Sequence, residues 1–249
     1  MPSPYNVSGQ PVELRDDPLG LVAAVLHCDD TMVILNKPPG IAVHKGPGFG
    51  DNLEAHFSAL RFGSPQNPAL AHRLDKDTSG CLVLGRDKSA LASLGQLFRK
   101  GLIEKTYWAV VVGSLQVDSG TVDAPLARRS HEKRSWWMKI DPSGDASVTH
   151  WRVLGRADGL VWVELKPQTG RTHQLRVHCA HIGTPIAGDH IYGGDTARSA
   201  ARHMHLHARA ITIPVYQKAP VVATASVPHH MQLLLGACGW KHDTGPVAT

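Results

Sequence analysis

From Leu21 onward the chain alternates short apolar runs with turn residues, a pattern typical of β-strands. Residues 21–40 indicate two strands joined at Asp29-Asp30. Further strands are expected at residues 81–85, 104–113, 120–126, 135–140, 147–155, 160–167, 203–214 and 221–228. Each run is far shorter than the roughly 20 apolar residues that a membrane-spanning helix needs.

Four segments have the periodicity and end signals of helices, namely residues 51–60, 87–101, 170–183 and 228–238. Asp51 and Asp87 are the expected N-caps of the first two. In the third, Leu175, Cys179 and Ile182 recur at helical spacing, so they are expected to face a core.

The strands follow one another in consecutive blocks, which predicts an α+β fold: a mostly antiparallel mixed sheet flanked by helices. Residues 1–18 are proline-rich and aperiodic, so we expect a flexible N-terminal arm. Residues 19–240 are expected to form a single domain, in which two lobes are conceivable, and residues 241–249 a C-terminal tail.

Composition narrows the class of protein only slightly. The 249 residues are 42% hydrophobic, which suffices for an ordinary core, and 26 Lys+Arg against 21 Asp+Glu give a formal charge of +5. This surplus is compatible with a nucleic-acid partner without requiring one. The four cysteines include no C-x-x-C pair, and the N-terminus has no signal-peptide pattern. A cytoplasmic protein with reduced thiols and no membrane segment is therefore expected.

The stretch "HRLDKDTSG", residues 72–80, concentrates opposed charges between two apolar runs. One interpretation is a surface loop whose charges pair off, each pair being worth less than about 1 kcal/mol. The other is a loop fixed at both ends, in which Arg73 keeps the Asp75 carboxylate ionised and oriented. Such a carboxylate suits a nucleophile or a base acting on a developing cation. The residues alone leave both interpretations open.

Residues 72–80 also resemble the signature loop of RluA-type pseudouridine synthases, H-R-L-D-x-x-T-S-G. Four further segments resemble motifs of the same family in the same order: "VILNKPPGIAVH" (33–44), "KTYWAVVVG" (105–113), "LKPQTGRTHQLRVHCAHIGTPIAGDHIYG" (165–193) and "LHA" (206–208). Together they extend over most of residues 33–228.

The resemblance implies isomerisation of uridine to pseudouridine in RNA, by a pseudouridine synthase catalytic domain spanning residues 19–240. It implies that Asp75 is the catalytic aspartate, acting at the C1′/C2′ region of the ribose. Tyr107 matches the tyrosine that packs against the target base, although an aromatic residue in a strand is ordinarily part of the core. Arg176 matches the arginine that pairs with the aspartate. On the proposed helix it lies beside the apolar stripe, so its side chain could equally be exposed to solvent.

Arg73 matches an arginine that the family uses beside the flipped nucleotide, and it also suits an internal ion pair. Substrate contacts are further expected from residues in matching motifs, namely Lys37, Lys105, Arg171, His173 and Leu206. Residues 127–137, "ARRSHEKRSWW", interleave cations with aromatics, as RNA-binding surfaces often do. Trp136 and Trp137 suit equally well a strand in which one of them is buried.

The expected partner is RNA, either tRNA or ribosomal RNA, and no cofactor is expected because nothing is oxidised and no phosphate is consumed. About 30 residues precede the Lys37 motif, too few for the S4-like domain of some relatives, so we expect the catalytic domain itself to select the RNA. A monomer is expected. The sequence leaves open which uridine is modified and whether Asp75 adds to C1′ or removes a ribose proton.

Rival interpretations come from other classes of protein. His203, His205 and His207 alternate and would face one side of a strand, which suggests a metal site. At about 3.3 Å rise per residue they are too widely spread for one ion, so no metal is expected. A family member that binds RNA without catalysis conflicts with the presence of the three catalytic candidates. A Ser79 or Cys81 nucleophile beside His72 lacks a third group to order a triad.

Overall fold

The computed structural model describes residues 17–46, 50–129 and 137–241. Contacts divide the chain into two compact units. The first consists of residues 1–105 and 208–225, and the second of residues 106–207 and 226–249. The expected arm and tail lie almost entirely outside the described residues, and a single domain over residues 19–240 stays a prediction beside this division.

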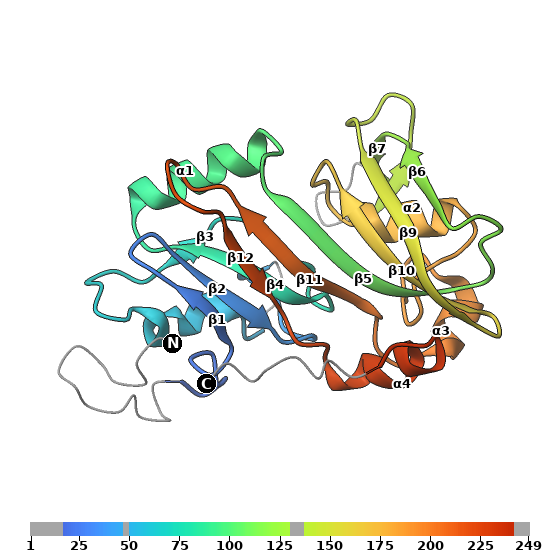
Figure 1. The fold of residues 1–249 in the computed structure, drawn as a ribbon, viewed down its shortest axis with the longest axis horizontal. Helices are drawn as coiled ribbons and strands as arrows, with labels where there is room; N and C mark the ends of the chain where they lie inside the picture. Colours follow the sequence, from blue (N-terminus) through green and yellow to red (C-terminus); the bar gives the residue numbers. More distant parts are fainter. Residues whose placement is uncertain (1–16, 47–49, 130–136, 242–249) are drawn as a thin grey trace. The chain divides into compact units, whose positions relative to one another are not determined.

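The first unit contains an antiparallel sheet centred on strand β4 (Figure 1). Every residue of β4 is buried. Its strands are β1 (Val25–Cys28), β2 (Met32–Lys37), β3 (Ala69–Leu70), β4 (Ser79–Gly85), β12 (Val221–Thr224) and β11 (Leu206–Ile213), the last of which begins in the second unit. β2 and β3 pair with β4, β1 pairs with β2, and β12 pairs with β11. The continuous apolar run of β4 is what a strand covered on both faces requires.

Local signals in the first unit act as the sequence predicts. The turn between β1 and β2 forms at Asp29, whose Oδ1 accepts the amides of Thr31 and Met32, each at 2.8 Å. Helix α1 (Lys88–Arg99) begins after Asp87, whose Oδ1 accepts the Ala90 amide at 2.8 Å. Both the two-strand turn and this N-cap are confirmed.

The predicted helix at 51–60 is a 3-10 helix, η1 (Leu53–Leu60), and its predicted cap is wrong. Asn52 is the N-cap, because it lies three residues before Ala55 and accepts that amide at 3.2 Å. The Asp51 carboxylate instead accepts a hydrogen bond from His56 Nε2 at 2.7 Å.

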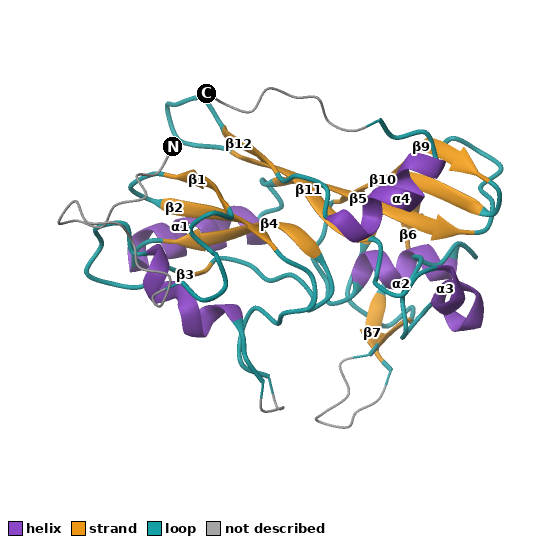
Figure 2. Ribbon diagram, turned by 90° about the horizontal axis from the view of Figure 1, so that it is seen from below, coloured by secondary structure: helices purple, strands orange, loops and turns teal. Residues whose placement is uncertain are grey.

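The second unit contains an antiparallel sheet in the order β5-β10-β9-β6 and a separate pair, β7-β8 (Figure 1). Its strands are β6 (Ser119–Asp123), β7 (Leu126–Arg128), β8 (Met138–Ile140), β9 (Val148–Ala157), β10 (Leu160–Pro167) and β5 (Glu104–Val112), the last of which begins in the first unit. Its helices are α2 (Gln174–His181), α3 (Gly194–Ala200) and α4 (His229–Ala237) (Figure 2).

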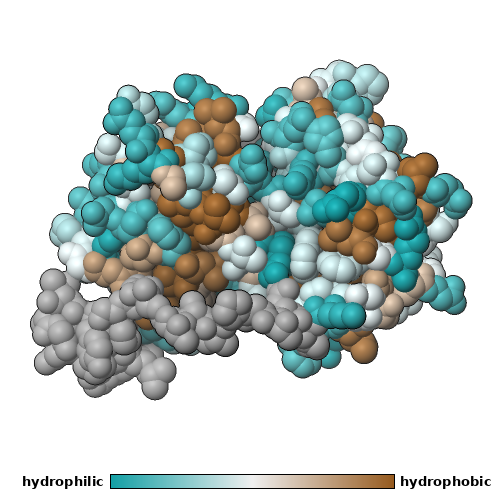
Figure 3. All heavy atoms as spheres, in the orientation of Figure 1, coloured by the Kyte–Doolittle hydropathy of each residue, from teal (hydrophilic) through white to brown (hydrophobic). Residues whose placement is uncertain are grey.

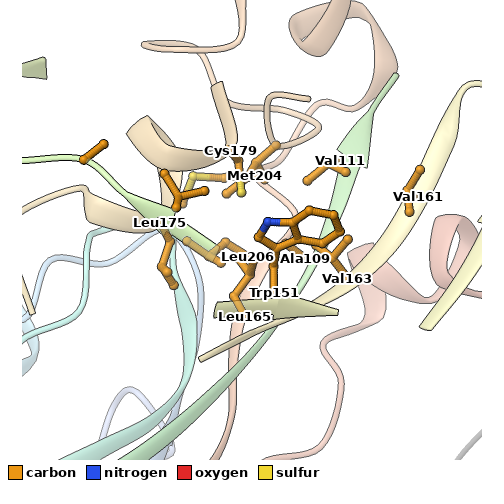
Figure 4. Close-up of a cluster of buried hydrophobic side chains, with 13 residues drawn as sticks. Ala109, Val111, Trp151, Val161, Val163, Leu165, Leu175, Cys179, Met204 and Leu206 are labelled. Atoms are coloured by element: carbon orange, nitrogen blue, oxygen red, sulfur yellow. The ribbon is translucent and has the colours of Figure 1, made fainter. Parts of the chain in front are cut away.

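Alternation along β5 gives this sheet two covered faces. Ala109 and Val111 face a core that includes Trp151, together with Leu175 and Cys179 of α2 (Figure 4). The predicted apolar stripe of this helix is therefore confirmed. The α2 helix is thereby fixed against the sheet, and the side chains around its first turns are fixed with it.

The opposite face of the same sheet is covered by α4. Val110 of β5 packs with Met231 and Leu235 of that helix. Trp108 packs against the same cluster, and its ring meets that of Trp162 edge-on, with centroids 4.8 Å apart. Residues adjacent in β5 thus belong to two cores, as a strand buried on both sides must.

These arrangements confirm the α+β class and the mainly antiparallel sheet. The structure adds β3 and α3, which the sequence pattern did not predict. Of the strand expected at 135–140, the described part is Met138–Ile140, and residues 135 and 136 lie outside the described residues. The surface in Figure 3 mixes hydrophilic side chains with separate hydrophobic patches. No described helix is long and apolar enough to cross a membrane.

The strand expected at 203–214 begins only at Leu206, which corrects the histidine argument. His203 and His205 precede the strand, so the three histidines do not line one strand face. His205 Nδ1 instead lies 2.8 Å from the carbonyl oxygen of His203. Across the described ranges, no three His, Cys, Asp or Glu side chains are grouped to hold a metal ion.

Candidate active site

The loop with Asp75 lies between β3 and β4 in the first unit. Leu74 and Thr78 are buried, Asp75 is half-buried, and Arg73 is exposed. The Thr78 amide donates to the Asp75 carbonyl at 3.1 Å and closes a tight turn. Buried residues on both sides therefore anchor the loop around the half-buried Asp75.

The buried ammonium of Lys37 holds this loop from inside the unit. Lys37 is 0% exposed, and its Nζ donates to the carbonyls of Pro38 at 2.7 Å and of Lys76 and Thr78 at 2.9 Å each. The Lys76 carbonyl also accepts the Gly40 amide at 2.9 Å. Lys76 and Thr78 follow Asp75 closely in the chain, so one side chain fixes the backbone next to the candidate acid.

Burial lowers the pKa of Lys37 to about 8, while the charges of Asp77 and Asp75 oppose that shift. The sequence predicted a substrate contact for this lysine. The structure places it inside the unit, bonded to backbone carbonyls, where it acts on the loop rather than at the surface. A buried ammonium is tolerated because three acceptors surround it.

Two further features fix the ends of the loop. At its start, His72 Nε2 accepts the Val83 amide of β4 at 3.0 Å, and the His72 ring packs on Phe98 with centroids 4.5 Å apart. Burial, reinforced by the charge of Lys105, lowers the pKa of His72 to about 3, so this ring is a neutral acceptor.

At the end of the loop, Gly80 has φ +104°, and a Cβ there would lie 2.2 Å from the Ala208 carbonyl oxygen. Only glycine fits this position, because both the backbone conformation and the space exclude a side chain. The glycine that ends the "TSG" stretch is thus required by the close packing of β4 against Ala208.

Arg176, on α2 of the second unit, is held by side chains. It is 5% exposed, so the plain surface arginine that the sequence left open is ruled out. Its Nε and Nη2 donate to the two carboxylate oxygens of Asp189, each at 2.7 Å. Burial raises the pKa of Asp189, but the hydrogen bonds and charge of Arg176 outweigh it and lower that pKa overall. The pair is ionised and its planar geometry is fixed.

An aromatic residue completes the support of Arg176. Its guanidinium carbon lies 5.1 Å from the centre of the Tyr192 ring. The Tyr192 hydroxyl accepts the Met138 amide of β8 at 2.8 Å and lies 2.8 Å from His173 Nδ1. His173 has φ +53° and is the N-cap of α2. The helix therefore begins at the next residue, which is three positions after Arg171. One hydroxyl therefore links the start of α2 to the β7-β8 pair.

The remaining predicted residues lie in varied surroundings. Tyr107 is half-buried at the border of the core containing Ala109. Lys105 is half-buried, and burial lowers its pKa. Leu206 is buried at 3% exposure. Arg171 is exposed and its Nε donates to the Ala146 carbonyl at 3.2 Å.

The four cysteines lie in the described part of the chain and form no disulfide. Cys28, Cys81, Cys179 and Cys238 are all free, and the last three are buried. Burial raises the pKa of Cys81 and of Cys179 to about 12 each, so neither is a thiolate near neutral pH. A cysteine nucleophile at Cys81 is therefore disfavoured.

Comparison with known proteins identifies the family of this fold. Residues 31–181 match the family model described as RNA pseudouridylate synthase. The chain belongs to this family. An uncharacterised RNA pseudouridine synthase of Zymomonas mobilis is 39% identical over 209 residues, which is 84% of this chain and 95% of that protein. The expected isomerase activity on RNA and the RluA-type resemblance are confirmed.

Two further relatives agree. Ribosomal large subunit pseudouridine synthase D of Xanthomonas campestris is 37% identical over 232 residues, which is 86% of this chain and 68% of that protein. The solved structure of human RNA pseudouridylate synthase domain containing 4 superposes with a TM-score of 0.74 at 28% identity, over 91% of this chain and 98% of that one. The synthase fold is therefore shared along nearly the whole chain.

Sequence reasoning did not single out Asp189 or Tyr192, although both lie in the "GDHIYG" motif. Nor did it assign His72 and Lys37 to support of the loop. The burial of Arg176, which explains why it needs a carboxylate partner, is visible only in the structure. No sequence signal marks Lys37 either, because its partners are backbone carbonyls.

Proposed function

We propose that this RNA pseudouridine synthase isomerises one or more uridines in structured RNA, either tRNA or ribosomal RNA, with Asp75 acting at the ribose C1′/C2′ region. The observation that supports this proposal most is the loop geometry: a half-buried carboxylate on a backbone fixed by a buried lysine. A rigid loop keeps an acid in position before substrate arrives, which is what catalysis by positioning requires.

The chemistry needs few groups. The N1–C1′ bond breaks, the uracil turns, and C5 bonds to C1′; C5 loses its hydrogen and N1 gains one, so the product is an isomer and no cofactor is consumed. Breaking a glycosidic bond develops positive charge at C1′, which a carboxylate stabilises. Addition of Asp75 to C1′ and removal of a ribose proton by Asp75 both use this same group.

Two residues of the second unit are proposed to act on the same nucleotide. Tyr107 packs against the uracil with a ring that is half-buried and already in contact with the core. Arg176 is proposed to supply a positive charge for pairing with the acid, its own orientation being set by Asp189. Arg73 is exposed, and we propose that it contacts the RNA beside the flipped nucleotide, at the gap which that nucleotide leaves in the base stack.

Contacts with substrate are also proposed for Lys105, His173 and Leu206. The enzyme is proposed to be a cytoplasmic monomer. Sedimentation of the purified protein over a range of concentrations tests the oligomeric state, and a single monomeric species is expected.

The direct test is to incubate wild type and Asp75→Asn with unmodified tRNA and ribosomal RNA transcripts and to map pseudouridine at each uridine with carbodiimide. We expect new sites with wild type that are absent with Asp75→Asn. Sites that persist in the variant would reject Asp75 as the acting carboxylate. Salt-sensitive RNA binding without any site would instead indicate a protein that binds RNA and does not modify it.

A further inference from the structure

A cavity of about 310 Å³ lies in the second unit, beside the pair of strands β7-β8. Its lining comes from three parts of the chain: the β7-β8 pair, the turn containing Asp145, and the loop before α2, which supplies Gly170, Arg171 and Thr172. Its volume is at the lower end for small-molecule sites and matches a single nucleotide rather than a duplex.

Two exposed arginines from distant parts of the sequence meet in this lining. Arg128 ends β7, and it pairs across the ribbon with Met138, which also lines the cavity. Arg171 precedes α2, and its Nε donates to the Ala146 carbonyl at 3.2 Å. Guanidinium groups are a usual protein site for a phosphate, because their planar donors match its oxygens.

One carboxylate also lies in the lining. Asp145 Oδ2 is 3.9 Å from Arg171 Nη1, and the two side chains are 70% and 41% exposed. An ion pair at that distance and exposure is weak. A phosphate entering the cavity can therefore displace it, while the negative charge reduces the affinity.

The residues next to the ends of β7 and β8 form a cation-aromatic pair. Arg129 and Trp137 pair there, with the Arg129 amide donating to the Trp137 carbonyl at 2.7 Å and its guanidinium carbon 5.6 Å from the Trp137 ring. Trp137 is 45% exposed, so the expectation of a buried strand tryptophan does not hold for it. Neither Arg129 nor Trp137 is among the residues that line the cavity.

We infer that the cavity between Arg128 and Arg171 is a binding site for one nucleotide of the RNA other than the uridine being isomerised, with its phosphate held by the two arginines. The site would fix where the RNA lies relative to α2, since Arg171 and Arg176 are five residues apart in the chain. This inference rests on the RNA-modifying activity proposed above.

The test uses a transcript whose modified uridine has been mapped with wild type. The double variant Arg128→Gln/Arg171→Gln is expected to raise KM about tenfold with kcat within about twofold, because the site binds ground state and transition state alike. On single-stranded RNA, the slope of log Kd against log salt is expected to fall by about 0.7 for each phosphate that the variant no longer neutralises. The matched control is Arg152→Gln/Arg156→Gln, whose arginines are exposed in the same unit, contact Glu164 and Asp118, and do not line the cavity.

A second variant is expected to change KM in the opposite direction. Asp145→Asn is expected to lower KM about two- to threefold, because it removes the competing carboxylate. Its backbone hydrogen bonds with Leu126 are unaffected. Asp158→Asn, an exposed charge change in the β9-β10 turn, is the matched control and is expected to leave KM unchanged.

Failure of this inference is distinguishable from failure of the proposed function. If wild type modifies the transcript but the pocket variants match their controls in KM and salt slope, the nucleotide site is rejected and the function stands. A fall in kcat at unchanged KM would also reject the site. If wild type makes no pseudouridine, the proposed function fails, and the salt slopes of RNA binding still decide whether the cavity contacts RNA.

Discussion

Two charged groups of this synthase, Asp75 in the first unit and Arg176 in the second, are held by different means. The loop around Asp75 is fixed through backbone carbonyls that accept from Lys37, and Asp75 itself is half-buried. Arg176 is fixed through its own side chain, by two bonds to Asp189, and is almost fully buried.

The difference suggests a division of tasks. Lys37 acts on the backbone that follows Asp75, so it fixes the place of the acid through its neighbours in the chain. A cation that supplies a steady charge is best fixed at the guanidinium itself, where burial strengthens its electrostatic effect. Disturbing the two supports should therefore have different effects on stability and on activity.

The largest effect is expected from Asp189→Asn, which leaves Arg176 buried without its carboxylate. Breaking one partner of a buried pair costs about 3–5 kcal/mol, so the free energy of unfolding in urea should fall by that amount. Asp158→Asn is the control and should change it little. Equal stability of the two variants would show that the Arg176–Asp189 pair contributes nothing to the fold.

This pair also has a pH signature. The pKa of Asp189 is lowered on folding, so its stabilising contribution is present above the ordinary aspartate value and is lost as pH falls through the folded pKa. Below about pH 4, wild type should lose stability faster than Asp189→Asn. Parallel curves for the two proteins would contradict the assignment.

A somewhat smaller effect is expected from Lys37→Met, which removes the donor to three carbonyls. Leaving buried acceptors unsatisfied should lower the free energy of unfolding by about 2–4 kcal/mol. Because the loop with Asp75 would no longer be held in position, the single-turnover rate of pseudouridine formation should fall as well. Lys88→Met, an exposed lysine of α1, is the control. A lower stability with an unchanged rate would mean that Lys37 supports the fold and not the position of Asp75.

Alkaline titration sharpens this test. The pKa of Lys37 is lowered from 10.5 to about 8 on folding, so between these values the unfolded chain binds a proton that the folded one does not. The stability of wild type relative to Lys37→Met should therefore rise with pH across that window. A flat difference would contradict a buried, titrating ammonium.

The smallest effect is expected from Tyr192→Phe. The ring beside Arg176 stays, but the hydroxyl that accepts the Met138 amide and meets His173 is removed. We expect destabilisation of about 1 kcal/mol in thermal unfolding. Tyr216→Phe, at a tyrosine 86% exposed in the first unit, should have no effect. If the two variants melt alike, the Tyr192 hydroxyl does not link α2 to β8.

Sequence reasoning mostly succeeded where one residue's side chain determines local structure, although it placed the cap of η1 at Asp51 instead of the neighbouring Asn52. The Asp29 turn, the Asp87 cap and the Leu175–Cys179 stripe all follow from periodicity and hydrogen-bonding capacity. It failed where backbone placement decides. The burial of Lys37 depends on carbonyls 39 and 41 residues away, and no pattern of side chains specifies their positions.

The same limit explains the histidines. Alternation in "HMHLH" predicted one strand face, but the strand begins at Leu206, and the His205 amide and carbonyl pair with Ala187 and Val110. For the candidate site, the family motifs predicted which residues to consider, and the structure showed how Lys37 and Arg176 are held. The pairing of Arg176 with Asp75 stays a prediction.

The most direct measurement of the central claim is the single-turnover rate of pseudouridine formation on a mapped transcript, for wild type, Asp75→Asn and Asp77→Asn. Both variants remove one carboxylate from the same loop, but only Asp75 is half-buried, while Asp77 is exposed. The account predicts a rate about 10²–10⁴-fold lower for Asp75→Asn and a change within a few-fold for Asp77→Asn. Equal decreases in both, or an active Asp75→Asn enzyme, would contradict it.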